Sequence, residues 1–142
     1  MKSLLSAKLL KGVSEVSASS LESNLVLLYF SASWCPPCRQ FTPLLMDFYN
    51  KVNAQHKAAE IILVSADRTQ EDFQKYFEKM PWLAVPFEEE TIRASLAQKC
   101  QVTTIPNLSL MDSQGNPVKE VRYDVAEKPN EALDLWKQAL SK

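Results

Sequence analysis

Glycine and histidine are scarce in this chain, and each shortage excludes a class of functional site. Only two of the 142 residues are glycines, Gly12 and Gly115, which excludes the glycine-rich loops that commonly hold phosphate groups. We therefore expect no nucleotide or flavin cofactor. A single histidine, His56, leaves few ligands for a metal ion, and we expect no metal site.

Charge and hydropathy exclude further classes of partner. The 16 basic and 17 acidic residues give a formal net charge of −1, without the basic surface that nucleic-acid binding requires. No apolar run approaches the roughly 18 residues of a membrane-spanning helix. The N-terminal residues resemble a signal peptide only faintly, because Lys8 and Lys11 interrupt a short apolar stretch. We expect a monomer in the cytoplasm, with the nucleus as the alternative compartment.

Length and composition are those of one globular domain. Apolar residues make up 46% of the chain, which is ordinary for a folded protein, and 142 residues suffice to bury a core. The sequence contains no evident repeat, linker or low-complexity tract. It therefore predicts a single domain over residues 1–142.

The stretch that carries chemistry is a pair of cysteines, Cys35 and Cys38, separated by two prolines. An apolar run over residues 25–30 predicts a buried strand before the pair, and apolar residues at helical spacing predict a helix from Pro36 to about Asn53. Cys35 then lies at a helix N-terminus, where free N–H groups and the helix dipole favour an anionic thiolate. Because the thiolate is the reactive form of cysteine, the pattern predicts a redox-active pair.

Two other interpretations of the pair are open. Half of a zinc site would need two more ligands, and the chain offers only Cys100 and His56. An inert buried pair does not account for the two prolines, or for Trp34 directly before Cys35. Cys100 itself shares a predicted helix face with two apolar residues, which predicts a small buried side chain, with a regulatory thiol as the alternative.

Strands and helices are predicted to alternate along the rest of the chain. A second β-branched run over residues 61–64, joined to the first by a helix, predicts a right-handed unit with parallel strands. Thr69 with Asp72 marks the start of another helix. The remaining predictions are a short helix or arm over 1–12, an edge strand over 13–17, a helix after 88–90, a strand over 108–111, a turn over 112–116, a returning strand through Val121, Tyr123 and Val125, and a last helix from 129–130.

An apolar segment over residues 81–87 has too many prolines for a regular strand. It either packs over the core or forms an apolar rim beside the active site. In the second case Trp82 would contribute to binding a substrate.

Two motifs together resemble the thioredoxin superfamily, namely the cysteine pair after a strand and Ile105-Pro106 before a hairpin. Residues 30–43 and 80–87 are similar to the tryparedoxin and nucleoredoxin branch, and residues 64–68 are closer to nucleoredoxin. The resemblance implies an α/β protein with the thioredoxin fold, in which helices flank both faces of a central mixed β-sheet. It also implies that the Ile105–Pro106 bond is cis and faces the cysteine pair.

The same resemblance implies a thiol–disulfide oxidoreductase that reduces protein disulfides. Cys35 attacks a substrate disulfide, and Cys38 resolves the mixed disulfide that results. The residues expected to bind the substrate are Trp34, Pro36, Pro37, Trp82, Ile105, Pro106 and Arg122. The alternative function is a nucleoredoxin-like adapter, in which the cysteine pair switches the binding of a partner protein.

Three departures from the family pattern leave parts of the reaction open. Thioredoxins carry a buried carboxylate six residues before the first cysteine, where this chain has Tyr29, so the proton acceptor for Cys38 is water, another carboxylate or a substrate thiol. Ala66 replaces a tryptophan of trypanosomatid tryparedoxins, and Arg122 alone remains of two arginines linked to their bis-glutathione reductant. The electron donor is therefore open between trypanothione, glutathione and thioredoxin reductase. The resemblance implies disulfide-containing proteins as targets, peroxiredoxin-like or other.

Overall fold

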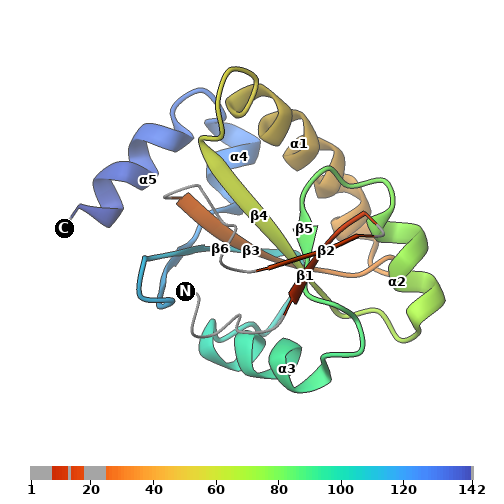
Figure 1. The fold of residues 1–142 in the computed structure, drawn as a ribbon. Helices are drawn as coiled ribbons and strands as arrows, with labels where there is room; N and C mark the ends of the chain where they lie inside the picture. The colour runs from red at the N-terminus through yellow and green to blue at the C-terminus, as the bar shows by residue number, and fades with distance from the viewer. Residues whose placement is uncertain (1–7, 13, 18–24, 142) are drawn as a thin grey trace.

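A mixed β-sheet forms the centre of the structure, a computed structural model that describes residues 8–12, 14–17 and 25–141 (Figure 1). The strands are β1 Lys8–Lys11, β2 Ser14–Ser17, β3 Leu25–Ser31, β4 Ala59–Ser65, β5 Leu83–Ala84, β6 Asn107–Met111 and β7 Pro117–Glu120. The helices are α1 Pro36–Val52, α2 Gln70–Phe77, α3 Glu90–Lys99, α4 Arg122–Glu127 and α5 Ala132–Leu140. In this described part of the chain the sheet has seven strands in the order β2-β1-β5-β4-β3-β6-β7.

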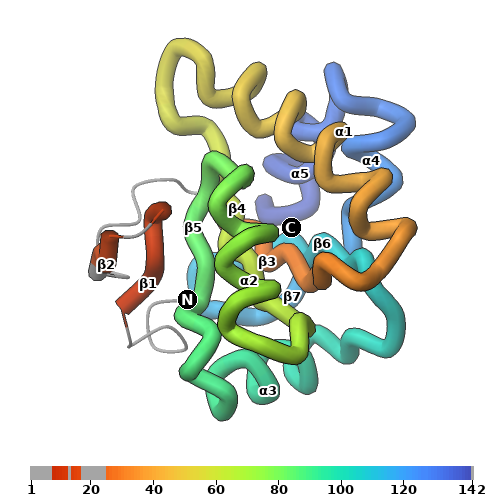
Figure 2. Tube along the Cα trace, turned by 90° about the vertical axis from the view of Figure 1, so that its right-hand side faces the viewer, coloured from red at the N-terminus to blue at the C-terminus, as the bar shows by residue number. Residues whose placement is uncertain are grey.

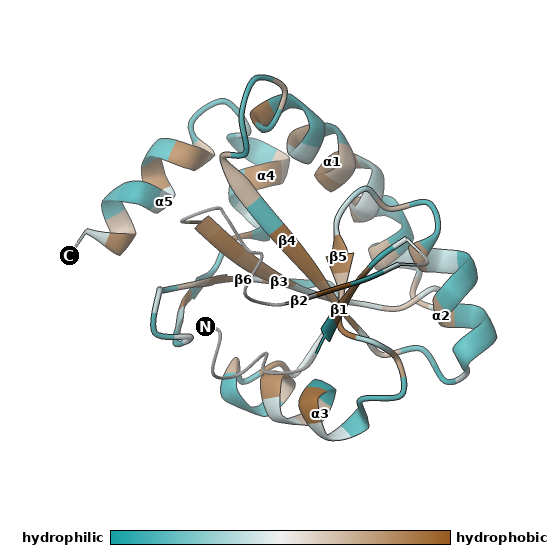
Figure 3. Ribbon diagram, in the orientation of Figure 1, coloured by the Kyte–Doolittle hydropathy of each residue, from teal (hydrophilic) through white to brown (hydrophobic). Residues whose placement is uncertain are grey.

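Strand β3 lies between β4 and β6, as the longest apolar run predicts. It pairs in parallel with β4, where Leu27 lies opposite Ile61, and antiparallel with β6, where Leu27 lies opposite Leu110. Every residue of β3 and β4 is buried, which is typical of parallel strands that are covered on both faces. Figure 3 shows β3 and most of β4 as apolar bands inside more polar helices.

The side chains of β3 alternate between two apolar cores, one on each face of the sheet. Leu27 and Tyr29 point into the first core, which α1, α2, α4 and α5 cover. Leu28 and Phe30 point into the second core, which α3 covers. Helices therefore flank both faces, as predicted, and Figure 1 shows α3 on the side of the sheet opposite α1 and α4.

The predicted N-terminal helix or arm is wrong for residues 8–11, which form β1. β1 pairs antiparallel with both β2 and β5, so hydrogen bonds join it to a neighbour on each side. Leu9 is buried in the second core, so the face of β1 that carries this side chain packs against that core. The predicted edge strand is confirmed over Ser14–Ser17, whereas residues 1–7 and 13 lie outside the described residues. Figure 2 shows both strands at the margin of the sheet, beyond β5.

The returning strand is shorter than predicted, and the residues after it form a helix. β7 ends at Glu120, and α4 starts at Arg122. Val121 and Val125 are buried, whereas Tyr123 is exposed. A spacing of four residues places Val121 and Val125 on one face of a helix. Together with Tyr123, the two valines also fit the alternation of a strand. The pattern over so short a segment does not distinguish the two structures.

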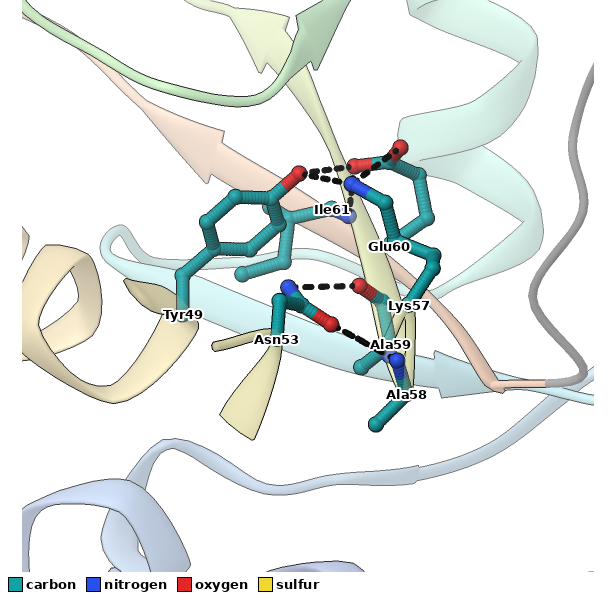
Figure 4. A network of polar contacts seen from close by, with 7 residues as sticks. All are labelled: Tyr49, Asn53, Lys57, Ala58, Ala59, Glu60 and Ile61. Carbon is teal, nitrogen blue, oxygen red and sulfur yellow. Dashed lines mark hydrogen bonds and ion pairs between the residues drawn. The ribbon is translucent and has the colours of Figure 1, made fainter. Parts of the chain in front are cut away.

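A polar network joins the last turn of α1 to the start of β4, at the end of α1 that lies away from the cysteine pair (Figure 4). One carboxylate oxygen of the buried Glu60 accepts a hydrogen bond from the Tyr49 hydroxyl at 2.8 Å, and the other lies 3.4 Å from Lys57 Nζ. The side-chain amide of Asn53 donates to the Ala59 carbonyl at 3.0 Å. Burial, together with the negative charge of Glu60, raises the pKa of Tyr49, so this phenol stays neutral.

We expect Trp136→Ala to lower the free energy of unfolding by about 3–5 kcal/mol, because it leaves a large cavity in the first core. The Trp136 ring is fully buried, its centroid lies 5.4 Å from that of Phe48, and its Nε1 donates to Asp124 at 2.9 Å. Urea denaturation measures the change. The exposed Tyr123 supplies the control, since Tyr123→Ala should change stability by no more than about 0.5 kcal/mol. Equal effects of the two substitutions would contradict the described packing of α5.

Candidate active site

Helix α1 begins at the cysteine pair and gives the two sulfur atoms different surroundings. Cys35 is the N-cap residue (φ −100°, ψ 109°), and its sulfur accepts a hydrogen bond from the Cys38 amide at 3.3 Å. Prolines occupy the first two helical positions, where an N–H group would have no partner within the helix. The Cys35 sulfur therefore lies at the positive end of the helix dipole, an arrangement that stabilises negative charge.

Both cysteines are free thiols, and both are largely buried. Cys35 is 4% exposed and Cys38 is fully buried, and Ala32 and Ile105 pack around them. The Cys35 thiol lies 3.8 Å from the carbonyl oxygen of Ile105, to which it donates. Of the two sulfur-bearing residues, only Cys35 has any surface that solvent or a substrate can reach.

The loop before β6 brings a cis proline to the cysteine pair. The Ile105–Pro106 peptide bond is cis, as the resemblance implies, and Ile105 packs against the cysteines. Nη1 of Arg122 donates to the carbonyl oxygen of Pro106, and its Nε lies 3.7 Å from a carboxylate oxygen of Glu120. Arg122 thus lies beside the cis proline, where it holds the loop through the proline's carbonyl group.

Trp34 gives the surface beside Cys35 an apolar character. This side chain is 46% exposed, and its Nε1 donates to the carbonyl oxygen of Ala66 at 3.0 Å, which fixes the ring. The guanidinium of Arg68 lies 5.1 Å from the ring centroid, within the range of a cation–π interaction. The two prolines of the motif are exposed as well, and Ile105 is half-buried. These residues surround Cys35, the reachable cysteine of the pair.

Trp82 lies in the core, so its predicted role in substrate binding is wrong. It is 1% exposed, and its ring contacts Tyr29 and Tyr49 edge-on, with centroids 5.9 and 5.6 Å apart. Residues 82–85 are all buried, and Leu83–Ala84 form the short strand β5. Of the two interpretations of this apolar segment, the structure therefore supports the one in which it packs over the core.

Asp67 is a site residue that the sequence interpretation missed. It follows β4 and is buried, and its Oδ1 accepts hydrogen bonds from the amide and the hydroxyl of Ser33 at 2.9 and 2.6 Å. Its backbone amide donates to the Ser65 hydroxyl at 2.9 Å. These bonds hold the turn that carries Trp34 to the end of the neighbouring strand. The available signal was a carboxylate placed directly after a buried parallel strand.

Four hydroxyl groups form a second feature that the sequence interpretation missed, which we call the hydroxyl cluster: Tyr29, Ser31, Thr42 and Tyr76. Thr42 Oγ1 lies 2.6 Å from the Tyr29 hydroxyl and 2.8 Å from that of Tyr76. The Tyr76 hydroxyl also lies 2.8 Å from Ser31 Oγ. Thr42 donates to the carbonyl oxygen of Cys38 at 2.9 Å. The cluster therefore connects β3, α1 and α2 directly beside Cys38.

The hydroxyl cluster lies beside a residue whose thiol is kept neutral by burial. Burial, reinforced by a hydrogen bond with Cys35, raises the pKa of the Cys38 thiol to about 11. A hydrogen bond with the side chain of Ser31 acts in the opposite direction and lowers this pKa. Cys38 is therefore a protonated thiol at neutral pH.

Cys100 lies on the other face of the sheet from α1. It is half-buried in the second core, and its sulfur lies 3.8 Å from the Met111 sulfur. Burial raises the pKa of the Cys100 thiol, which makes the reactive thiolate scarce at neutral pH. These surroundings fit the predicted structural side chain better than a regulatory thiol.

Neither a metal-binding cluster nor a membrane-spanning helix occurs in the described part of the chain. Within residues 8–12, 14–17 and 25–141, no three His, Cys, Asp or Glu side chains gather in a way that could hold a metal ion. In the same part of the chain, no helix combines the length and the apolar character that crossing a membrane requires.

Comparison with known proteins places this site in a family. Residues 23–117, more than half of the chain, match a family model described as thioredoxin-like. The chain belongs to the thioredoxin-like family. Among its relatives is tryparedoxin of Trypanosoma brucei brucei, which is 42% identical over 130 residues. The matched region covers 90% of this chain and 90% of that tryparedoxin. Nucleoredoxins of Danio rerio and Homo sapiens are 41% and 46% identical over 84% and 71% of this chain.

The chain spans 29% and 23% of the length of those two nucleoredoxins, so it corresponds to one part of them. Among solved structures, tryparedoxin II in complex with glutathionylspermidine is 40% identical, with a TM-score of 0.83 over 92% of this chain and 93% of that one. Tryparedoxin from Trypanosoma brucei is 42% identical, with a TM-score of 0.82 over 91% of this chain and 90% of that one. The predicted thioredoxin fold is confirmed, and the cysteine pair has the setting of a dithiol–disulfide oxidoreductase of this family.

We expect Asp67→Ala to lower the free energy of unfolding by about 1–3 kcal/mol, because two donors of Ser33 lose their acceptor. Urea denaturation measures this loss, and amide hydrogen exchange at Ser33 should become faster. Asp47 on the exposed side of α1 supplies the matched control, for which Asp47→Ala should change neither quantity appreciably. Unchanged exchange at Ser33 would show that Asp67 does not hold the turn.

We expect Cys100→Ala to leave disulfide reduction nearly unchanged and to lower the free energy of unfolding by about 1 kcal/mol through lost packing. An insulin-reduction assay with dithiothreitol measures the activity, and thermal unfolding monitors the fold. Loss of most of the activity by a folded Cys100→Ala protein would assign this thiol a role in the reaction.

Proposed function

We propose that this chain is a thiol–disulfide oxidoreductase that reduces protein disulfides with Cys35 and Cys38. The observation that carries the proposal is the asymmetry of the pair. Cys35 has the reachable surface and lies at the helix N-terminus, whereas Cys38 is fully buried behind it. A nucleophile must meet its substrate, and a resolving thiol need meet only the first cysteine. We also propose that residues 1–142 form a single domain, since one sheet runs through the described part.

In the first step the thiolate of Cys35 attacks one sulfur of the substrate disulfide. A bond forms between the two sulfurs, the substrate S–S bond breaks, and its electron pair leaves on the second substrate sulfur, which takes a proton from solvent. The Cys38 amide donates to the attacking sulfur and holds it at the helix end. The product is a mixed disulfide on Cys35.

In the second step Cys38 attacks Cys35 and releases the remaining substrate thiol. The Cys38 thiol gives up its proton, its sulfur bonds to the Cys35 sulfur, and the departing substrate sulfur ends as a thiol. One substrate disulfide has then been reduced to two thiols, and the cysteine pair has been oxidised to a disulfide. A small dithiol or a reductase must return two electrons to the pair before the next turnover.

The surface around Cys35 suits an extended peptide that carries a disulfide. The carbonyl oxygen of Ile105 lies 3.8 Å from the Cys35 sulfur, and the backbone beside the cis proline can pair with a substrate chain as an added strand. Trp34, Pro36 and Pro37 supply the apolar contacts. We propose peroxiredoxin-like and other disulfide-containing proteins as targets.

The charges beside this surface favour an anionic electron donor. Arg68 lies over Trp34, and Arg122 lies beside Pro106. Two guanidinium groups suit a thiol that carries carboxylates, such as glutathione. The relative in complex with glutathionylspermidine supports a glutathione-type thiol as the donor, and trypanothione or a thioredoxin reductase are the other donors that we propose. A reducing compartment such as the cytoplasm suits such a pair.

A second candidate function is a redox-sensitive adapter, favoured by the 41–46% identity to nucleoredoxins. In this case the cysteine pair would switch the binding of a partner protein without catalytic turnover. Insulin reduction separates the two functions, because repeated turnover requires a catalyst, whereas an adapter captures one partner in a fixed ratio.

We expect Cys38→Ser to accumulate reducible covalent complexes with proteins in a lysate, because the first step proceeds and nothing then releases the mixed disulfide. Cys35→Ser should form none, because the reachable nucleophile is gone. Non-reducing electrophoresis detects the complexes, and their composition identifies the targets. Cys100→Ala is the control and should behave like the parent protein. Equal trapping by both serine variants would refute the assignment of the two roles.

A further inference from the structure

The carboxylate of Glu120 lies where the last strand of the sheet turns into a helix. β7 ends at Glu120, which lies opposite Ser109 of β6. The next pair of the ladder is only half formed, because the Val121 amide donates to the Leu108 carbonyl at 2.7 Å but Val121 offers no acceptor in return. Val121 has a ψ of 17°, far from that of a strand, since the chain enters α4 here. The amide of the buried Leu108 therefore needs another acceptor.

Glu120 supplies that acceptor from its side chain. Its Oε2 accepts hydrogen bonds from the Leu108 amide at 3.0 Å and from the Arg122 amide at 3.1 Å. The second bond satisfies one of the free N–H groups at the start of α4. Oε1 lies 3.7 Å from Nε of Arg122, whose Nη1 donates to the carbonyl oxygen of Pro106. Glu120 thus holds Leu108 directly and Pro106 through Arg122.

These contacts fix both ends of the segment 106–108, which begins at the cis proline. Ile105 directly precedes this segment, packs against the cysteine pair and accepts a hydrogen bond from the Cys35 thiol at 3.8 Å. A shift of residues 106–108 would therefore move the Ile105 backbone relative to the Cys35 sulfur. A substrate that pairs as an added strand needs this backbone in a fixed place, because its main-chain hydrogen bonds weaken steeply with misalignment. A small disulfide that forms no such bonds needs only the sulfur.

We propose that Glu120 is a positioning residue of the reaction, which makes the site selective for disulfides carried by extended peptides. The inference rests on the proposed function and deepens its first step. Glu120 acts through the backbone of residues 106–108 and takes no part in the making or breaking of bonds. Loss of its carboxylate slows the attack of Cys35 on a peptide disulfide and leaves the attack on a small disulfide unchanged.

The reach of the Glu120 side chain matters more than its charge. The ion pair with Arg122 is long, and 35% of the Arg122 side chain and 32% of the Glu120 side chain are exposed, so solvent weakens this attraction. The hydrogen bonds to the two amides have ordinary lengths, and their loss would leave the buried Leu108 amide without a partner. Glutamine can accept both bonds without a charge. Aspartate keeps the charge, but it is one carbon shorter and cannot reach the Leu108 amide from the same backbone.

The test compares two disulfides that share a leaving group. One is 5,5′-dithiobis(2-nitrobenzoate), and the other is an extended peptide whose single cysteine is joined by a disulfide to 5-thio-2-nitrobenzoate. In both cases the Cys35 thiolate bonds to one sulfur, the S–S bond breaks, and its electron pair leaves on the coloured thiolate. The full chain in a Cys100→Ala background is used, and the second-order rate constant of the first release is measured. The readout is the rate constant for the peptide divided by that for the small disulfide.

We expect Glu120→Ala to lower this ratio about tenfold, through the rate constant for the peptide alone. Glu120→Asp should lower the ratio as well, whereas Glu120→Gln should keep it within about twofold of the parent value. The matched control is Glu127→Ala, which removes the same charge from the exposed far end of α4 and should leave the ratio unchanged. If Glu120→Ala does not fold, the contrast between Glu120→Asp and Glu120→Gln decides the question.

A second control changes the peptide and leaves the protein as it is. Methylation of the peptide nitrogens on both sides of the cysteine removes the N–H groups that would pair with the strand edge at Ile105. The parent protein should react slowly with this peptide, and Glu120→Ala should slow the reaction no further.

A merely structural role of Glu120 would slow both disulfides equally or leave both rate constants unchanged. Either result would overturn the inference and leave the proposed function standing, and so would a lower ratio in Glu120→Gln than in Glu120→Asp. A parent protein that releases no coloured thiolate from either disulfide would overturn the proposed function itself, and the inference with it.

Discussion

The hydrogen bond from the Cys38 amide to the Cys35 sulfur is the constraint on which the site depends. It places one sulfur at the helix end and turns the other inward, toward β3. The two prolines between them have no amide hydrogens that could compete for this acceptor. The remaining parts of the site are arranged around that geometry: the loop with Ile105 on one side, the turn with Trp34 on another, and the hydroxyl cluster beneath.

Much of the fold could be predicted from local patterns. The unbroken apolar runs of β3 and β4 can be stable only inside the sheet, and Thr69 caps α2 through the Asp72 amide as its position predicts. The place of Cys35 at the start of α1 follows from the strand and helix on either side of it. These features are encoded within a few residues, so one sequence is enough to recognise them.

The features that were not predicted depend on residues far apart in the sequence. Tyr76 reaches Ser31 across two elements, and no local pattern indicates that their hydroxyls meet. An apolar residue such as Trp82 fits either a segment over the core or a rim beside the active site. Only the packing of Tyr29 and Tyr49 against its ring shows that it lies in the core. β1 exists because β2 and β5 supply its hydrogen bonds, which its own short sequence cannot indicate.

The short helix α4 is hydrogen-bonded both to the site and to α5 in the C-terminal part of the described chain. Its first residue, Arg122, binds the carbonyl oxygen of Pro106, and Asp124, two residues later, binds the indole of Trp136 in α5. Both attachments therefore lie within the six residues of α4. A hydrogen bond on either side of α4 thus connects α5 to the loop whose Ile105 packs against Cys35.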